Sequence, residues 1–453
     1  MDVKDSKWII YGTGRSGVCA ANLLISRGAD VLMYDENVNV NTEEVKAKIT
    51  EGEIEIIAGE FPVNLLSDYR FLLVSPGVPV DTPVFDEIRN AGCKVVSEIE
   101  LAYLLGKGTV YAITGTNGKT TTTSLLGKIM QDYSGNAYTV GNIGVPYTGI
   151  ANESNDESKI VLEVSSFQLE TIEVFRPHVS AILNITEDHL NRHHTMEEYI
   201  RVKERITENQ TYDDFCILNY EDEVLRSFGE EIKDKVKVVF FSSANKLDDG
   251  IYLDGRNIVA GFKDDEVILN VDDLNIIGVH NFENVMAAVA MALCAGVPTD
   301  SIVKSCKEFV AVPHRIEPCG EVRGVRYYND SKGTNPDAAI KAIEAMDRPT
   351  LLIGGGYDKQ SDFRPWIKAF GGKVKYLVLE GATKEKIKEA ALAENFPEDH
   401  IVMKETMIDA LAFCMENAVP GDAVLLSPAC ASWGEFRDFE QRGDVFKEYV
   451  KTH

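Results

Sequence analysis

The stretch with the most definite chemistry is one where an apolar run meets a polar loop. Its sequence is Val110-Tyr111-Ala112-Ile113-Thr114-Gly115-Thr116-Asn117-Gly118-Lys119-Thr120-Thr121. The β-branched run predicts a buried strand, and the threonines after the second glycine predict the start of a helix. The backbone N–H groups of such a loop, together with the helix dipole, attract an anion. The stretch therefore predicts a binding site for a nucleoside triphosphate.

Two side chains of this loop have the chemistry that phosphates require. Lys119 supplies a positive charge for the outer phosphates, and the hydroxyl of Thr120 is a ligand for Mg²⁺. The spacing departs from the standard phosphate loop, because Ile113 occupies the place of its first glycine. An ordinary glycine turn is the alternative, and Gly-Lys-Thr-Thr directly after a buried strand argues against it.

Two further strands lead to residues that could bind a metal ion. The apolar run at residues 159–164 contains Glu163, and the run at residues 179–185 leads to Thr-Glu-Asp-His, which ends at His189. Carboxylate and imidazole groups at the ends of buried strands suit Mg²⁺ beside a phosphate loop. A solvated glutamate and a structural histidine are the alternatives, and the local pattern leaves the role of His189 open.

A lysine lies on the apolar face of the helix that follows. Met196, Tyr199, Ile200, Lys203 and Ile206 recur at steps of three and four residues, so they share one helical face. Lys203 is therefore predicted to point inward. Two interpretations stay open: a buried stem whose ammonium reaches water, or a functional amine near the predicted metal site.

The amino-terminal segment contains a second phosphate-binding pattern. Gly12-Thr13-Gly14-Arg15-Ser16-Gly17 follows a strand at residues 7–11, and Asp35 ends the next strand. This spacing, with an acidic residue about twenty positions later, is typical of dinucleotide-binding domains. Taken alone it predicts NAD. Another loop, Ser75-Pro76-Gly77, follows the strand at residues 71–74.

The composition excludes several classes of partner. The 453 residues include 72 acidic and 46 basic side chains, which gives a formal net charge of −26. Nucleic acid and anionic membranes need a basic protein face, so neither is expected as a partner. The sequence contains no apolar run of membrane-spanning length, no signal peptide and no Cys-x-x-Cys pair among its eight cysteines. We expect a cytoplasmic monomer with reduced thiols and no membrane insertion.

Strands and helices alternate along the chain, which predicts an α/β protein of three domains. We expect a Rossmann-like domain at residues 1–97 and a central domain of the phosphate-loop ATPase type, with a mixed or parallel sheet, at residues 98–312. A second Rossmann-like domain with a doubly wound sheet is expected at residues 313–453. Its predicted strands end in polar or glycine loops, where such a sheet binds its ligands.

Five motifs together resemble the Mur ligase family, whose members use ATP to form amide bonds in peptidoglycan precursors. They are Gly-Thr-Asn-Gly-Lys-Thr-Thr at 115–121, Glu-Val-Ser-Ser-Phe-Gln-Leu-Glu at 163–170, His-Asn-x-x-Asn at 280–284, Pro-His-Arg at 313–315 and Asn-Asp-Ser-Lys at 329–332. The resemblance covers essentially the whole chain. The motifs at 426–432 and 436–443 further resemble the branch that adds D-glutamate to UDP-N-acetylmuramoyl-L-alanine. The Asp-Asn-Pro-Arg motif of the meso-diaminopimelate-adding branch is absent.

The resemblance implies three binding sites and reassigns the amino-terminal pattern from NAD to a UDP-sugar. The residues implied to bind the UDP-sugar are Gly12, Thr13, Gly14, Arg15, Ser16, Gly17, Asp35, Ser75, Pro76, Gly77, Asn142 and Gln168. Those implied to bind ATP are Gly115, Thr116, Asn117, Gly118, Lys119, Thr120, Thr121, Asn281, Asn284, Arg315 and Asp330. Those implied to bind D-glutamate are Thr334, Lys359, Ser432 and Phe439.

The resemblance also implies two Mg²⁺ ions and a reaction through an acyl phosphate, with release of ADP and phosphate. The implied catalytic residues are Lys119, Glu163, His189, Lys203 and Lys332. The implied metal ligands are Thr120, Glu163, His189 and Lys203, the lysine as its carbamate. Glu36 and Asn37 stand where related ligases often carry Thr-Arg, which leaves the contacts to uracil and pyrophosphate open.

Two other enzyme classes stay open at this point. A folylpolyglutamate-type ligase shares the central and carboxyl-terminal architecture, but it does not need a UDP-sugar domain. A nicotinamide dehydrogenase accounts for Gly12–Gly17 but leaves the phosphate loop at residues 115–121 without a role.

Overall fold

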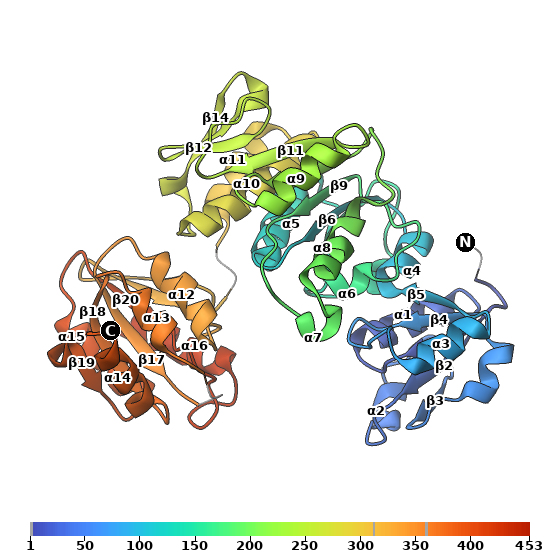
Figure 1. Cartoon of the computed structure of the whole chain (residues 1–453), viewed down its shortest axis with the longest axis horizontal. Helices are drawn as coiled ribbons and strands as arrows, with labels where there is room; N and C mark the ends of the chain where they lie inside the picture. Colours follow the sequence, from blue (N-terminus) through green and yellow to red (C-terminus); the bar gives the residue numbers. More distant parts are fainter. Residues whose placement is uncertain (1–2, 311–312, 358–360) are drawn as a thin grey trace. The chain divides into compact units, whose positions relative to one another are not determined.

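The chain divides into two compact units in the computed structural model, which describes residues 3–310, 313–357 and 361–453. The first unit extends to Asn270 and includes Glu283–Cys306, and the second consists of Val271–Phe282 and Lys307–His453. The first unit contains two β-sheets and the second unit contains one (Figure 1). The predicted α/β fold class is confirmed. The three-domain boundaries at 97/98 and 312/313 remain a proposal.

The first sheet has five parallel strands in the order β3-β2-β1-β4-β5. They are β1 (Lys7–Tyr11), β2 (Asp30–Asp35), β3 (Glu55–Ala58), β4 (Phe71–Val74) and β5 (Lys94–Ser97). Helices α1 (Arg15–Ser26) and α4 (Glu98–Leu105) pack on one face, and α3 (Pro83–Asn90) packs on the other. A short helix, α2 (Thr42–Lys46), follows β2. This order and the two-sided helical cover are Rossmann-like, as predicted.

The second sheet is mixed, with nine strands in the order β14-β13-β12-β11-β10-β9-β6-β8-β7. They are β6 (Thr109–Thr114), β7 (Ala137–Gly141), β8 (Lys159–Glu163), β9 (Val179–Ile182), β10 (Phe215–Asn219), β11 (Lys237–Ser242), β12 (Ile251–Asp254), β13 (Asn257–Ala260) and β14 (Glu266–Asn270). All the strands between β12 and β7 in this order, including those two, run parallel to one another. Strand β13 is antiparallel to both β12 and β14. Strand β6 therefore lies between β8 and β9, and the loops after these three strands share one edge.

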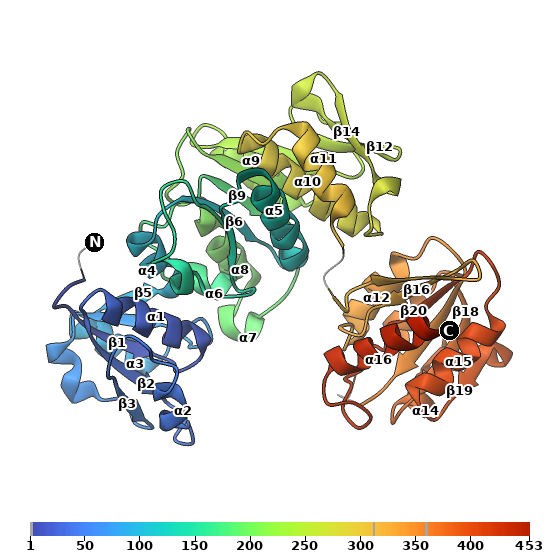
Figure 2. The same cartoon turned by 180° about the vertical axis from the view of Figure 1, so that it is seen from behind.

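Helices cover both faces of the second sheet (Figure 1 and Figure 2). They are α5 (Lys119–Ser134), α6 (Ser166–Leu169), α7 (Leu190–His193), α8 (Met196–Glu204), α9 (Glu223–Ile232), α10 (Val279–Cys294) and α11 (Thr299–Glu308). Helices α8 and α9 pack on the same face as part of α4, whereas α5 packs along β7 and β8. The apolar residues 285–292 of α10 are fully buried, as expected of a helix that is hydrophobic all round.

The third sheet has the order β15-β16-β20-β17-β18-β19, and β15 is antiparallel to its neighbour. The strands are β15 (Glu317–Val322), β16 (Val325–Asn329), β17 (Thr350–Gly355), β18 (Val374–Glu380), β19 (Ile401–Met403) and β20 (Ala423–Leu426). Helices α12 (Pro336–Glu344), α13 (Arg364–Lys368) and α14 (Lys384–Ala393) pack on one face. Helices α15 (Met407–Asn417) and α16 (Phe439–Thr452) pack on the other, which confirms the doubly wound sheet.

Helix α4 connects the first sheet to the second by buried carboxylates. Glu100 accepts hydrogen bonds from the backbone N–H groups of Glu173, Val174 and Phe175, at 2.9 to 3.0 Å. Glu98 accepts from the N–H group and the hydroxyl of Thr148. Because each bond to a charged acceptor is stronger than a neutral one, these contacts hold the segments after β7 and α6 against α4.

The eight cysteines, all within the described ranges, are free thiols, three of them partly accessible and five buried. Within the same ranges, every helix is too short or too polar to cross a membrane.

Candidate functional site

The loop after β6 requires glycine at two positions. Gly115 and Gly118 have φ angles of +146° and +86°. A Cβ atom on Gly118 would lie 2.1 Å from Oδ1 of Asn284, so a larger residue cannot be accommodated without displacement. Helix α5 begins at the next residue, Lys119, and the unsatisfied N–H groups of its first turn lie at the loop. The structure thus brings Asn284 to the predicted phosphate site.

Side chains from the end of β9 and from α8 hold this loop in place. The N–H group of Asn117 donates to Oδ1 of Asn184 at 2.8 Å, and Nδ2 of Asn184 donates back to the carbonyl of Asn117 at 3.1 Å. The hydroxyls of Thr116 and Tyr199 lie 3.1 Å apart. The sequence did not predict these roles of Asn184 and Tyr199, although the polar end of an apolar strand was an available signal.

Two lysine side chains converge on the carbonyl oxygen of Gly115. Lys119 donates to the carbonyls of Gly115 and Thr116 at 2.8 and 2.9 Å, and Lys203 donates to that of Gly115 at 2.9 Å. Lys203 is 1% exposed, and its Nζ lies 4.6 Å from the centroid of the Tyr199 ring. Burial, and then the charge of Lys119, lower the pKa of Lys203 to about 7. The inward orientation of Lys203 is confirmed, and an ammonium that reaches water is excluded.

The carboxylate of Glu163, at the end of β8, is 2% exposed. Its Oε1 accepts a hydrogen bond from Nδ2 of Asn142 at 2.9 Å, whereas its Oε2 is buried and has no hydrogen-bond partner in the described part of the chain. Leaving a buried carboxylate oxygen unsatisfied is costly, and a bound cation would satisfy it. The solvated-glutamate alternative is wrong, and the site fits an Mg²⁺ ligand.

His189 lies at the start of α7 in a left-handed conformation, with φ of +53°. Its half-exposed ring lies 5.0 Å from that of Phe167, and its Nε2 lies 3.4 Å from Oδ2 of Asp188. Across residues 3–310, 313–357 and 361–453, no three His, Cys, Asp or Glu side chains form a ready metal centre. Metal binding by Thr120, Glu163, His189 and Lys203 therefore remains a proposal.

Gln168 has a structural role in the loop after β8. Its Oε1 accepts hydrogen bonds from the N–H group and hydroxyl of Ser165, which forms a capping box for α6. Burial raises the pKa of the nearby Glu98 carboxyl, although Thr148 and Gln168 act in the opposite direction. Its contact with a UDP-sugar remains a prediction.

The amino-terminal pattern forms a tight turn at the carboxyl edge of the first sheet. A Cβ atom on Gly17 would lie 2.0 Å from the carbonyl oxygen of Gly12, so helix α1 approaches β1 closely because of its glycine. Oδ2 of Asp35 accepts from the N–H group and the hydroxyl of Thr13 at 2.9 and 2.6 Å. Burial raises the pKa of Asp35, but these donors outweigh burial and the net pKa is lowered.

Two further loops lie beside this turn. The hydroxyl of Ser75 is buried and lacks a hydrogen-bond partner among the described residues. Arg15 donates to the carbonyl of Gly144, in the loop that carries Asn142. The structure therefore brings together four of the five segments predicted to bind the UDP-sugar, at the end of the sheet where parallel α/β domains bind ligands.

In the second unit, the motif at residues 329–332 lies at the start of α16. The hydroxyl of Ser331 donates to the carbonyl of Phe439 at 2.8 Å, and Nζ of Lys332 lies 5.7 Å from the Phe439 ring. Arg442 is 1% exposed and donates to Ser331 and to the carbonyl of Cys430. Arg442 therefore connects this motif with the segment that leads to Ser432, a role that the sequence did not predict.

In the second unit, the side chains of two residues predicted to contact ATP form hydrogen bonds with other residues of the protein. Asp330 accepts from the hydroxyl of Ser427 at 2.7 Å and from the N–H group of Ile316 at 3.3 Å, and burial raises its pKa to about 7. Nδ2 of Asn281 donates to the carbonyl of Ile277 at 2.7 Å. Contacts of both residues with a nucleotide remain predictions.

The remaining predicted residues of the second unit differ in accessibility. Arg315 is exposed, Thr334 is partly buried and Ser432 is buried. Lys359, predicted to bind D-glutamate, lies outside the described residues. The amino-acid site thus stays a prediction.

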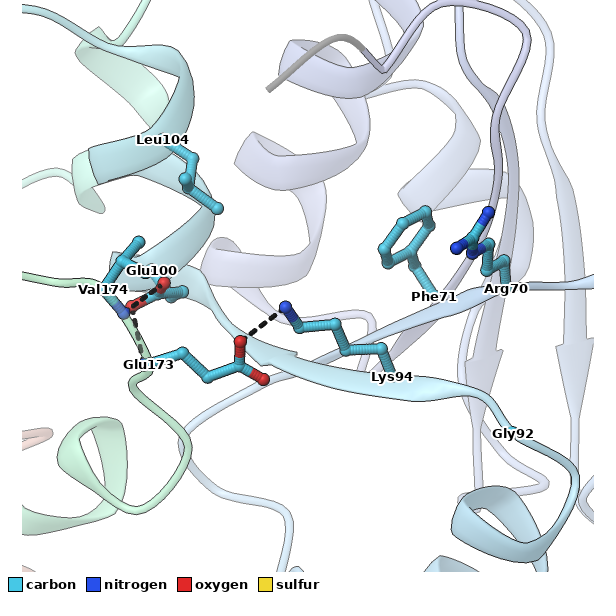
Figure 3. A pocket seen from close by; sticks show the side chains of 8 residues that line it. All are labelled: Arg70, Phe71, Gly92, Lys94, Glu100, Leu104, Glu173 and Val174. Atoms are coloured by element: carbon cyan, nitrogen blue, oxygen red, sulfur yellow. Dashed lines mark hydrogen bonds and ion pairs between the residues drawn. The ribbon is translucent and has the colours of Figure 1, made fainter.

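A cavity of about 550 Å³ lies away from all of these residues (Figure 3). Its lining residues are Arg70, Phe71, Gly92, Lys94, Glu100, Leu104, Glu173 and Val174. Phe71 and Lys94 begin β4 and β5, so the cavity lies at the amino edge of the first sheet, opposite Gly12. Figure 3 shows Lys94 reaching toward Glu173, and their charged atoms lie 2.5 Å apart. The cavity is therefore separate from the predicted sites.

Family models and curated proteins match the chain along its length. The models described as Mur ligase MurD-like N-terminal domain, Mur ligase middle domain and Mur ligase glutamate ligase domain match residues 6–97, 113–292 and 314–430. Proteins named UDP-N-acetylmuramoylalanine--D-glutamate ligase from Lachnospira eligens and Clostridioides difficile are 52% and 44% identical, with 100% of each chain covered.

Solved structures resemble the chain in fold. A pseudomurein peptide ligase type C from Methanothermus fervidus is 18% identical, with a TM-score of 0.55 and 99% of each chain covered. MurF from Acinetobacter baumannii is 17% identical, with a TM-score of 0.53, and the match covers 85% of this chain and 92% of that one.

Gly118→Ala is expected to weaken nucleotide binding at least ~10-fold, because strain and collision of this kind cost about 1–3 kcal/mol. The added methyl group would meet Asn284 and displace the loop from its present position. Titration with a fluorescent ATP analogue measures the effect. Gly135→Ala is the matched control, because Gly135 ends the same helix at positive φ but has open space around its Cα. Normal binding by the Gly118 variant would show that the loop is not the nucleotide site.

Proposed function

The chain belongs to the Mur ligase family, and we propose that within it the chain joins D-glutamate to UDP-N-acetylmuramoyl-L-alanine at the expense of ATP. The observation that carries the proposal is the end-to-end similarity to curated D-glutamate ligases. The glycine loop after β6, with Lys119 at its end, supports it, because a ligase must bind ATP. The alternative of a nicotinamide dehydrogenase leaves this loop without a role.

In this proposal ATP lies at the loop after β6. Lys119 exchanges its bonds to backbone carbonyls for bonds to phosphate oxygens, and the N–H groups of α5 face the same charge. The other proposed contacts are Gly115, Thr116, Asn117, Gly118, Thr120, Thr121, Asn281, Asn284, Arg315 and Asp330. Lys332 is proposed to act on the transferred phosphate.

The reaction needs activation because oxide is a poor leaving group from a carboxylate. An oxygen of the alanyl carboxylate attacks the γ-phosphorus of ATP, and the bond from that phosphorus to the ADP oxygen breaks. The amine of D-glutamate then attacks the carbonyl carbon of the acyl phosphate, loses a proton and expels inorganic phosphate. Lys119 stabilises the negative charge that collects where two anions meet.

The proposed metal ligands are Thr120, Glu163, His189 and Lys203, and two Mg²⁺ sites are proposed. The unpartnered Oε2 of Glu163 supports a cation at this position. When bound, Mg²⁺ neutralises phosphate charge. A pKa near 7 leaves much of Lys203 neutral in a neutral solution. The nitrogen of a neutral amine bonds to the carbon of CO₂ as one C=O π bond opens, and loss of a proton to solvent leaves a carbamate with two oxygen ligands.

The two remaining substrates are assigned to the other sheets. The UDP-sugar is proposed to bind the loops at Gly12–Gly17, Asp35 and Ser75–Gly77. Asn142 and Gln168, which follow strands β7 and β8 of the second sheet, are also proposed to contact it. D-Glutamate is proposed to bind Thr334, Lys359, Ser432 and Phe439. We further propose that the protein acts as a cytoplasmic monomer, since free thiols and nucleotide substrates fit that compartment.

An assay of ADP release across candidate amino acids tests the function. Turnover is expected only when UDP-N-acetylmuramoyl-L-alanine and D-glutamate are both present, and the product should gain the mass of one glutamyl residue. Absorbance at the nicotinamide band should stay constant in a parallel reaction with NADH. Preference for another amino acid, or ADP release without the UDP-sugar, would refute the proposed specificity.

Lys203→Ala is expected to be nearly inactive, and acetate is expected to restore part of its activity by supplying a carboxylate in the vacated space. Lys203→Arg should be as poor as the alanine variant, because a guanidinium keeps the charge but forms no comparable carbamate. Initial rates with and without acetate measure both effects, and Lys233→Ala serves as an exposed-lysine control. A fully active arginine variant, with no acetate effect on the alanine variant, would exclude the carbamate.

Lys359→Ala and Ser432→Ala are expected to raise the KM for D-glutamate at least ~10-fold, since a charged or buried hydrogen bond is worth about 1–3 kcal/mol. The KM values for ATP and the UDP-sugar should change little. Each KM is measured with the other two substrates saturating, and Lys368→Ala controls for loss of a surface charge. An unchanged KM for D-glutamate in both variants would place the amino-acid site elsewhere.

A further inference from the structure

Arg192, on the short helix α7, connects segments that belong to two different predicted binding sites. Its guanidinium donates to the carbonyl of Val78 at 2.9 Å and to the carboxylate of Glu170 at 2.6 Å. The guanidinium carbon also lies 4.9 Å from the centroid of the Phe167 ring. The side chains of Arg192 and Glu170 are each 11% exposed. None of the roles proposed above uses this buried ion pair.

The first partner of Arg192 belongs to the loop proposed to bind the UDP-sugar. The N–H group of Val78 donates to the carbonyl of Ser75 at 3.0 Å, which closes the turn Ser75-Pro76-Gly77-Val78. The carbonyl that Arg192 contacts is therefore part of the same turn. His194 and Asp81 also connect the two segments, at 2.8 Å, but this exposed pair contributes little.

The other partners of Arg192 lie on a firmly held segment. Arg205 donates to the backbone carbonyls of Leu169, Glu170 and Ile172. Glu100 accepts the next three N–H groups, at residues 173–175. Phe167 and Glu170 thus form a fixed support against which the guanidinium packs.

Helix α7 itself has little intrinsic stability. It contains four residues and is flanked by His189 and His194, both at positive φ. A single helical turn is unstable in isolation, so side-chain contacts decide where α7 lies. Those contacts include the bonds of Arg192, the 2.9 Å contact between Nε2 of His193 and the hydroxyl of Ser166, and the stacking of the His193 ring on Phe167. His189, a proposed metal ligand, is the first flanking residue of this helix.

We propose that Arg192 is a positioning residue that couples occupation of the UDP-sugar loop to the placement of His189. A bound UDP-sugar fixes the turn that contains Val78, the turn fixes the guanidinium, and the guanidinium fixes α7. The proposal rests on the proposed function for the identity of the ligand. A guanidinium suits the task because one nitrogen, Nη2, donates to both the carbonyl and the carboxylate while the planar group lies over the Phe167 ring, a contact that an ammonium makes less well.

Arg192→Ala and Arg192→Lys test the coupling, and Arg201→Ala is the matched control. Arg201 pairs with Glu198 on the exposed face of the next helix, α8. Calorimetric titration with UDP-N-acetylmuramoyl-L-alanine, without ATP, is expected to show at least ~10-fold weaker binding by the alanine variant, because that variant loses two hydrogen bonds from a charged donor. The lysine variant should lie between the alanine variant and wild type, and the control should match wild type.

A second readout follows the placement of His189. At saturating UDP-sugar the alanine variant should need several-fold more Mg²⁺ for half-maximal turnover, while its KM for D-glutamate stays within about 2-fold of the wild-type value. A variant with a lowered melting temperature but wild-type UDP-sugar affinity and Mg²⁺ requirement would show that Arg192 is only a structural brace.

The titration distinguishes failure of this proposal from failure of the proposed function. Wild type could bind the UDP-sugar more tightly than Arg192→Ala does and still not use D-glutamate. That result would refute the proposed reaction, whereas the coupling of Arg192 to the loop would stand. If the alanine variant does not fold, the lysine variant still tests the proposal. Equal affinity of the lysine variant and wild type for the UDP-sugar would overturn the requirement for a guanidinium.

Discussion

The side-chain nitrogens of Lys119 and Lys203 share the carbonyl oxygen of Gly115, and the chemistry of the central site depends on this crowding of two amines. Burial and the charge of Lys119 both disfavour the protonated form of Lys203, which is why its pKa falls to about 7. In a chain with a net charge of −26, only such local clusters can attract anionic substrates. Loss of a proton from Lys203 relieves the repulsion between the two side chains and leaves Lys119 as the cation that faces the phosphates.

The loops around this cluster are held before any ligand binds. Asn184 and Tyr199 fix the phosphate loop, and Asn142 occupies one oxygen of Glu163 while the other stays unsatisfied. Fixed donors are more effective than mobile ones, because no reorganisation is needed when charge develops. Glu100 and Arg192 extend the same principle, since each fastens a connecting segment to its neighbour through a charged side chain.

The second unit shows the same use of buried charge for a different purpose. Arg442 and Asp330 are both buried, and their bonds tie the motif at residues 329–332 to the loops that follow β20. The motif was identified in the sequence as a contact to ATP, but the carboxylate of Asp330 is occupied by Ser427. A motif alone does not distinguish a side chain that binds substrate from one that supports the loop, because both roles require the same polar residue at the same position.

The sequence by itself determined the fold class, the glycine loop between β6 and α5 and the inward orientation of Lys203. These follow from glycine spacing, strand patterns and the helical period, which depend on neighbours along the chain. Only the tertiary structure decided the unpartnered oxygen of Glu163, the bonds of Asn184 to the loop and the link from Arg192 to Val78. The hydrogen bonds of Glu163 with Asn142, of Asn184 with Asn117 and of Arg192 with Val78 join residues that are 21, 67 and 114 positions apart in the chain. No local pattern encodes such pairs, because packing of whole elements brings them together.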